Sequence, residues 1–170
     1  MKPWTSRSDV LGEGAVLHSI CRNRRTGLSD TDDPISFHRM NVIAHGIDLV
    51  ECARVADILK RHPDRFPQRV LTDAERRTAE LFNDPVPHVS GRFAAKEAVL
   101  KMLGTGWRGR ISWRDIEITN DALGQPLVAL RDECARIARE RGIGRVLISI
   151  SHTREFAAAS AIGLASTGTP

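Results

Sequence analysis

The stretch Gly91–Lys101 has the sequence GRFAAKEAVLK and carries more information than any other part of the chain. Drawn as a helix, it places Arg92, Lys96 and Glu97 within about one turn of each other, with Lys101 four residues beyond Glu97. Cations around a carboxylate suit a magnesium-bound polyphosphate, because the carboxylate binds the metal and the cations neutralise phosphate oxygens. The alternative is an ordinary solvated helix face with ion pairs, and this stretch alone does not separate the two interpretations.

Composition narrows the class of protein. A chain of 170 residues fits one domain, or one domain with a tail. The formal net charge of +4 favours an acidic partner or a phosphate-bearing ligand. Aromatic residues make up only 5% and Tyr is absent, so we expect no base-stacking surface and no nucleic-acid partner.

The chain carries no sign of export or of membrane insertion. Its three cysteines, Cys21, Cys52 and Cys134, are scattered and show no zinc-binding spacing, which indicates a reducing compartment. No apolar run approaches the ~20 residues that span a bilayer, and the N-terminus lacks a signal pattern. We therefore expect a cytoplasmic protein without a membrane partner.

Residues 1–39 differ in character from the rest. They are rich in charged, Ser and Thr residues and show no sustained apolar period, which predicts a poorly ordered extension. Met40 opens a more regular sequence, so residues 40–170 are predicted to form the domain. Met40 could be the true translation start, or the extension could be a real tail, and the sequence leaves both open.

From Met40 onward, helical and strand patterns alternate. Strands are expected near 42–47, 115–119, 127–130, 146–150 and 157–162, and helices near 49–61, 72–81, 88–103 and 131–141. The order lacks βαβ regularity, and turn chemistry at 120–126 joins two of the strands, so the predicted class is α+β.

Three short motifs stand out in a fixed order: Gly46-Ile47-Asp48, the stretch 92–101, and Ser151-His152-Thr153. Each is weak alone, because an Asp between strand and helix is most often a helix cap and a lone His is most often structural. Together they resemble the 4′-phosphopantetheinyl transferase superfamily, and within it the small holo-acyl-carrier-protein synthase group. The resemblance extends over about 42–164, with supporting matches at 70–72, 104–106, 115–118 and 124–126.

This resemblance implies a fold, a reaction and an assembly. The fold would be an antiparallel sheet wrapped by helices. The reaction would be the magnesium-dependent transfer of the 4′-phosphopantetheine group from coenzyme A to a serine of an acyl carrier protein, for fatty acid biosynthesis. The other product would be adenosine 3′,5′-bisphosphate. The assembly would be a homotrimer with its active sites between subunits.

The resemblance also implies roles for single residues. Asp48 and Glu97 would bind Mg²⁺, and with Lys101 they would form the catalytic group. Lys101 would also contact the diphosphate of coenzyme A. The further contacts to coenzyme A would come from Arg92, Lys96, His152 and the loop of Gly104, Thr105 and Gly106, with the turn 124–126 nearby. The base that takes the serine proton could be Glu97 or a water on the metal, and the sequence does not choose.

The helix after Asp48 would bind the acidic carrier protein. By resemblance, the docking residues are Arg54, Arg61, Arg65 and the apolar Phe66, and complementary charge of this kind speeds encounter. The alternative is again a solvated helix face. The segment 62–64 lengthens the bend before Arg65 and Phe66 relative to the usual family pattern.

Two rival functions belong to other classes. A basic, non-catalytic module could bind an acidic protein or a nucleic acid, as the arginine content allows. A magnesium enzyme could act on a different nucleotide diphosphate. The first should not bind coenzyme A in a magnesium-dependent way, and the second should leave a carrier protein unmodified.

Overall fold

The computed structural model describes residues 41–106 and 109–166, and every structural statement below concerns these residues. The elements in chain order are β1 (Val42–Glu51), α1 (Cys52–Arg61), α2 (Arg65–Val70), α3 (Asp73–Ala79), α4 (Val86–Met102), the 3-10 turn η1 (Trp113–Asp115), β2 (Ile116–Asn120), β3 (Pro126–Leu130), α5 (Asp132–Glu140), β4 (Ile143–His152) and β5 (Phe156–Ala165). The extension predicted over 1–39 and the domain start at Met40 lie outside the described residues.

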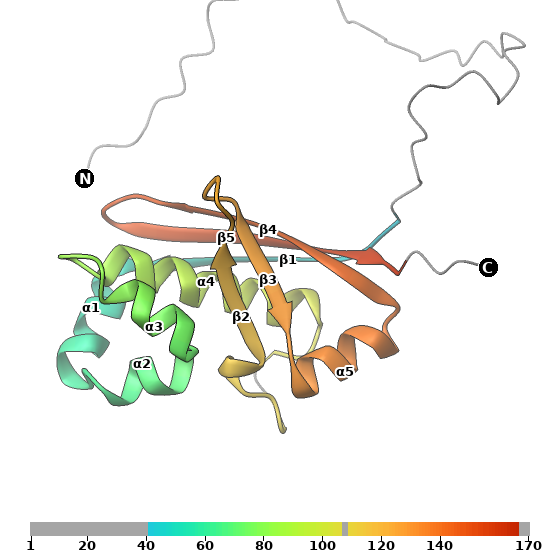
Figure 1. Ribbon diagram of the computed structural model, residues 1–170, viewed down its shortest axis with the longest axis horizontal. Helices are drawn as coiled ribbons and strands as arrows, with labels where there is room; N and C mark the ends of the chain where they lie inside the picture. Colours follow the sequence, from blue (N-terminus) through green and yellow to red (C-terminus); the bar gives the residue numbers. More distant parts are fainter. Residues whose placement is uncertain (1–40, 107–108, 167–170) are drawn as a thin grey trace, which may run out of the picture. The chain divides into compact units, whose positions relative to one another are not determined.

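The strands form two antiparallel sheets, which confirms the α+β class. One sheet has three strands in the order β1-β5-β4, and the other is the β2–β3 hairpin. The central strand β5 pairs with β1 from Leu164 to Phe156 and with β4 from Ala165 to Ala157. Figure 1 shows the β2–β3 hairpin running across the direction of the three longer strands.

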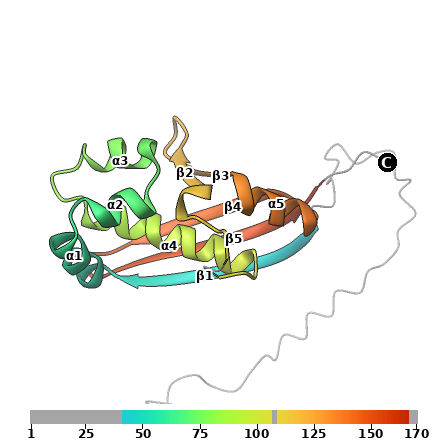
Figure 2. The ribbon, with the colours of Figure 1, turned by 90° about the horizontal axis from the view of Figure 1, so that it is seen from below.

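Helix α4 packs along one face of the three-stranded sheet, where it contacts all three strands (Figure 2). The two surfaces meet closely because small residues line both of them. Ala94, Ala95 and Ala98 of α4 are fully buried, and β5 presents Ala157 and Ala161, which are also fully buried. Packing of this density brings side chains at the edge of the interface within reach of each other.

A buried ion pair ties α4 to the elements on its other side. Lys96 Nζ lies 2.7 Å from Glu75 Oε2 of α3, and both side chains are fully buried. The same ammonium donates to the carbonyl oxygens of Val70 at 2.7 Å and Trp113 at 3.0 Å. The Glu75 carboxylate also accepts from the backbone N–H of Ile118 at 2.8 Å. One pair therefore joins α2, α3, η1 and β2 to the central helix.

Local sequence signals predicted some boundaries well. The capping box at Thr72 is present: the Glu75 N–H donates to the Thr72 hydroxyl, and the Thr72 N–H donates to the Glu75 carboxylate. The helix predicted near 131–141 is present as α5, and its Cys134 and Ile137 are buried. These features depend on residues close in the chain, so they can be seen in the sequence.

The first strand was predicted too short. β1 continues through Asp48 and Leu49 to Glu51, because pairing with β5 extends to Glu51 opposite Phe156. Leu49, expected at the start of a helix, lies in the strand with 65% of its surface exposed. Asp48 is therefore no helix cap, and α1 begins only at Cys52. Long-range strand pairing has overridden the local helical spacing.

Candidate active site

Asp48 of β1 faces α4 and meets a cation there. Lys101 Nζ donates to Asp48 Oδ1 at 2.7 Å, and the Asp48 side chain is only 13% exposed. Gly46 allows this approach, since a Cβ at that position would collide with the Ala98 carbonyl oxygen and lie 2.5 Å from the Met102 amide nitrogen. The glycine of the first motif thus lets the strand lie against the helix backbone.

Glu97 lies one turn before Lys101 on α4 and is half-buried. Burial raises the pKa of its carboxyl, and the negative charge of Asp48 raises it further, while Lys101 and Arg54 act in the opposite direction. The two carboxylates are therefore close enough to repel each other. Such a pair is stabilised by a cation placed between its oxygens.

The donor set fits Mg²⁺ better than a metal held by protein ligands alone. Within residues 41–106 and 109–166, no group of three or more His, Cys, Asp and Glu residues is placed to hold a metal ion. Mg²⁺ is usually bound through one or two carboxylates, with substrate phosphates and water completing its shell. Asp48 and Glu97 supply the carboxylates that this arrangement needs.

A second group of predicted residues lines a cavity of about 570 Å³ between α3, α4, the hairpin and β4. Arg92 lies in its wall with 8% exposure and donates through Nη2 to the Asn120 side-chain oxygen. His152 at the end of β4 lines the same cavity, as do Gly124 and Pro126 of the predicted turn. These residues come from three segments that are distant in the chain: α4, the hairpin and the end of β4.

The two groups lie on different sides of α4. Arg92 and Glu97 are five residues apart, which on a helix separates their directions by about 140°. Glu97 turns toward β1, and Arg92 turns toward the hairpin. The predicted residues thus form two groups, and we call Asp48, Glu97 and Lys101 the first half-site and the cavity of Arg92 and His152 the second half-site.

The comparisons with known proteins identify the family. The model of the 4′-phosphopantetheinyl transferase superfamily matches residues 44–159.

The chain belongs to the 4′-phosphopantetheinyl transferase superfamily.

Its relatives in the transferase superfamily match most of their own length. The holo-acyl-carrier-protein synthase of Moorella thermoacetica is 45% identical, over 69% of this chain and 90% of the relative. That of Caldanaerobacter subterraneus is 43% identical, over 70% of this chain and 92% of the relative.

Solved structures of such synthases share the fold. The Neisseria meningitidis enzyme has a TM-score of 0.67 and 34% identity, over 72% of this chain and 98% of that chain. The Bacillus anthracis enzyme, solved in complex with coenzyme A (3′,5′-ADP), has a TM-score of 0.62 and 36% identity, over 74% of this chain and 98% of that chain. The predicted family, fold and enzyme class are confirmed.

Lys96 does not lie where a phosphate-binding residue of this transferase would be expected. All three protons of its ammonium are used, by Glu75, Val70 and Trp113, and no part of the side chain is exposed. The predicted contact of Lys96 with coenzyme A is therefore wrong for this structure. Helical spacing put Lys96 near Glu97 but could not show that α2, α3 and η1 cover its face.

The loop after α4 has the backbone that its glycines allow. Gly104 and Gly106 have φ values of 63° and 55°, in the left-handed region that glycine adopts without strain. Thr105 between them has a buried hydroxyl with no hydrogen-bond partner. The loop begins three residues after Lys101, and its role toward the nucleotide stays a prediction.

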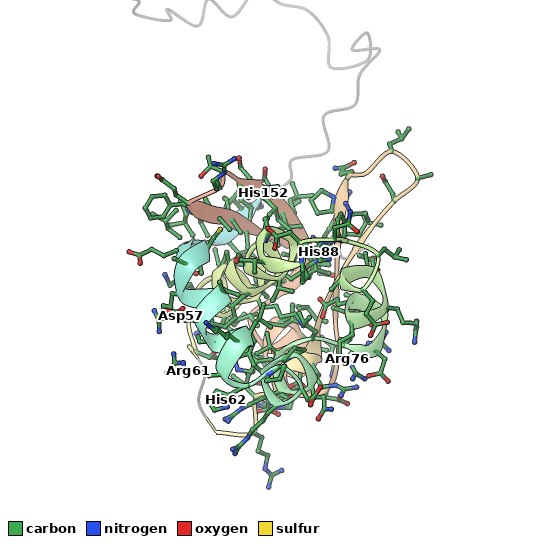
Figure 3. All side chains as sticks on the ribbon, turned by 90° about the vertical axis from the view of Figure 1, so that its left-hand side faces the viewer. Asp57, Arg61, His62, Arg76, His88 and His152 are labelled. Carbon is green, nitrogen blue, oxygen red and sulfur yellow. The ribbon has the colours of Figure 1, made fainter. Side chains whose placement is uncertain are left out.

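The predicted docking residues lie on α1 and α2. Arg54, Arg61 and Arg65 are exposed, and Figure 3 shows Arg61 with Asp57 and His62 along this part of the transferase domain. Phe66 is half-buried, and its ring packs edge-on against Phe93 with centroids 5.8 Å apart. The arginines are thus available to a partner, whereas much of the Phe66 side chain packs against the core.

Two residues in the second half-site were not predicted. Asn120 was taken only as turn chemistry, and His88 only as the start of a helix. Asn120 accepts from Arg92 and donates to the Gly124 carbonyl at 2.7 Å, so it links the arginine to the hairpin turn. No spacing rule could have found it, because the contact joins residues 28 positions apart.

Proposed function

We propose that this transferase moves the 4′-phosphopantetheine group of coenzyme A to a serine of an acyl carrier protein and releases adenosine 3′,5′-bisphosphate. The observation that carries the proposal is the meeting of Asp48, Glu97 and Lys101 where β1 crosses α4. The relatives named holo-acyl-carrier-protein synthases support it, as does the Bacillus anthracis relative solved with coenzyme A. Fatty acid biosynthesis in the cytoplasm is the setting that we infer.

Asp48, Glu97 and Lys101 would have different roles in the reaction. Mg²⁺ held by Asp48 and Glu97 would neutralise charge on the diphosphate during the displacement. Lys101, half exposed at the rim, is placed to stabilise the phosphate that leaves, because charge develops there as the bond breaks. Glu97 is our candidate for the base that takes the serine proton, since burial and Asp48 raise the pKa of its carboxyl.

The residues of the second half-site support binding of the nucleotide part of coenzyme A. Arg92 and His152 offer nitrogen donors at one end of the cavity, and the hairpin turn of Gly124 and Pro126 forms its rim. Cationic donors in a walled cavity suit a phosphorylated nucleotide. We infer that coenzyme A spans both half-sites, with its diphosphate at Glu97.

A homotrimer would join the half-sites of neighbouring copies. The face of the three-stranded sheet opposite α4 carries solvent-exposed apolar side chains. Among them are Ile43, Ile47 and Leu49, with 43%, 61% and 65% of their surface exposed. Apolar surface of this kind is typical of a protein–protein interface. Val146 and Ile148 of β4 are partly buried and pack against the core.

The carrier protein would bind along α1. Arg54 is exposed there, and its positive charge opposes the rise in the pKa of Glu97, so the docking surface adjoins the carboxylates. An acidic carrier bound to these arginines would thereby bring its serine to the reacting group. Among the helices of the described ranges, none has the length and apolar content to cross a membrane.

The decisive experiment is a carrier modification assay. An apo acyl carrier protein incubated with this protein, coenzyme A and Mg²⁺ should gain the mass of one phosphopantetheine. Chelation of Mg²⁺ should abolish the gain, and added Mg²⁺ should restore it. An unmodified carrier alongside turnover of another nucleotide diphosphate would refute the proposal, and so would magnesium-independent binding of carrier alone.

A further inference from the structure

Lys101 pairs with a carboxylate that the proposed function assigns to the metal. Its ammonium donates to Asp48 Oδ1 at 2.7 Å, which joins the last turn of α4 to β1. The Asp48 side chain is 13% exposed and that of Lys101 is 52% exposed, so the carboxylate is largely enclosed while the ammonium is open to solvent. The chain itself therefore supplies one oxygen of the first half-site with a cation.

The ammonium of Lys101 and a metal ion would compete for this carboxylate. Mg²⁺ binds carboxylate oxygens at about 2.0–2.1 Å. An ammonium bonded to the same carboxylate would stand close to the ion, where two positive charges repel each other. A carboxylate has two oxygens, so the conflict is one of charge and not of space. Metal binding at Asp48 is therefore opposed as long as Lys101 stays there.

The same competition involves Glu97. Burial and the negative charge of Asp48 raise the pKa of the Glu97 carboxyl, and the positive charges of Lys101 and Arg54 oppose the rise. Lys101 also donates a hydrogen bond to Asp48, so it lies within reach of both carboxylates. It thus reduces the repulsion between them, which is also what a metal ion between their oxygens would do.

Lys101 can leave its carboxylate without disturbing the fold. Its backbone is fixed, because its carbonyl oxygen accepts from the N–H groups of Leu103 and Gly104 at the end of α4. Its side chain is half exposed and carries the ammonium on a flexible four-carbon stem. Lys96 of the same helix is the contrast, since its side chain is fully buried in an ion pair. An ammonium placed like that of Lys101 can exchange one anion for another at little cost in stability.

We propose that Lys101 is a placeholder cation, which pairs with Asp48 until metal and coenzyme A bind and then moves to the diphosphate. This inference rests on the proposed function, which assigns Mg²⁺ to Asp48 and Glu97 and the diphosphate to Lys101. Metal alone should bind weakly, because it must displace the ammonium. The diphosphate offers the displaced ammonium a new anion, so coenzyme A should strengthen metal binding, and metal should strengthen binding of coenzyme A by the same factor.

The test measures Mn²⁺ binding by electron paramagnetic resonance, with and without coenzyme A and with no carrier present. Mn²⁺ takes the same oxygen ligands as Mg²⁺. Without coenzyme A, Lys101→Met should bind Mn²⁺ about five- to tenfold more tightly than the wild type, because the ammonium no longer competes for Asp48. With coenzyme A the variant should lose this advantage, because the wild-type ammonium then neutralises the diphosphate. Lys60→Met is the matched control, since it removes the same charge from an exposed position on α1, and it should leave the Mn²⁺ affinity nearly unchanged.

Two results would overturn the placeholder role of Lys101 and leave the proposed reaction standing. One is that Lys101→Met binds Mn²⁺ no more tightly than the wild type. The other is that it binds more tightly by the same factor with and without coenzyme A, as a plain loss of charge would cause. Lack of Mn²⁺ binding to the wild type with coenzyme A present would instead refute the proposed metal site, and the placeholder role with it. Thermal unfolding verifies the fold, and added Mg²⁺ should raise the melting temperature of Lys101→Met more than that of the wild type.

Discussion

At the scale of single residues, the ionised carboxyl of Glu97 lowers the stability of the native protein. Its folded pKa is raised by burial and by Asp48, so its ionised form is less stable in the native protein than in the unfolded chain. This penalty is complete above the raised pKa and disappears below the ordinary value of 4.5. The native protein therefore contains an unfavourable charge at Glu97, which our proposal explains by a role in metal binding.

We predict that Glu97→Gln abolishes carrier modification and raises the melting temperature of the metal-free protein at pH 7. The neutral amide removes the desolvation and repulsion that the ionised carboxyl suffers. The gain should shrink as the pH falls and vanish below the ordinary pKa. Thermal unfolding at pH 7 and pH 4 with a chelator measures both values. A variant less stable than the wild type at pH 7 would contradict this account.

Lys96 is the opposite case, a charged residue in the binding helix with a structural role. Lys96→Met would leave the buried carboxylate of Glu75 without its partner, which costs about 3–5 kcal/mol. The double variant Lys96→Met with Glu75→Leu should recover much of this loss, and urea unfolding measures both. A stable Lys96→Met protein with weakened binding of coenzyme A would restore the phosphate contact first expected.

At the scale of elements, the contact between β1 and α4 creates the first half-site. We predict that Gly46→Ala destabilises the fold by more than the 1–3 kcal/mol usual for overpacking, because the new Cβ meets helix backbone. Activity should fall too, since Asp48 moves away from Lys101. Gly91→Ala is the control, because there a Cβ meets only the Ile150 side chain at 3.2 Å. Equal losses in both variants would argue against the close approach.

Helix α1 is the element that should determine recognition of the carrier. Arg54→Glu is predicted to raise KM for the carrier about tenfold, because it replaces attraction to an acidic partner by repulsion. The effect should be smaller at high salt, since salt screens exposed charges. Steady-state kinetics with each substrate varied in turn will measure this. Arg77→Glu, a charge reversal at an exposed position on α3, serves as the control. Equal changes in KM for carrier and coenzyme A would argue against a docking role.

At the scale of the whole molecule, the exposed face of the three-stranded sheet should mediate assembly. We predict that the protein is a homotrimer in solution and that Ile47→Asp converts it to monomers with reduced activity, because a carboxylate buried at the interface would oppose association. Light scattering after size exclusion measures the mass. Leu123→Asp, at a 94% exposed turn position away from that face, should leave the assembly intact. A fully active wild-type monomer would show that one copy completes its own site.

The sequence by itself determined which reactive side chains the protein has and their order along the chain. Asp48, the 92–101 stretch and His152 identified the family, and the capping box at Thr72 predicted the start of α3. Both signals can be read from the sequence, because the motifs are recognised by their order and a capping box joins residues only three positions apart.

Only the tertiary structure decided what each of those groups can reach. Helical periodicity relates Arg92, Lys96 and Glu97 to one another by angle, but not to the elements that cover them. Lys96 is buried because α4 packs against α2 and α3, and Glu97 lies near Asp48 because α4 contacts β1. Arg92 donates a hydrogen bond to the hairpin. Pairing with β5 likewise extended β1 past Asp48. These outcomes depend on contacts between distant segments, whose energies no local window of the sequence contains.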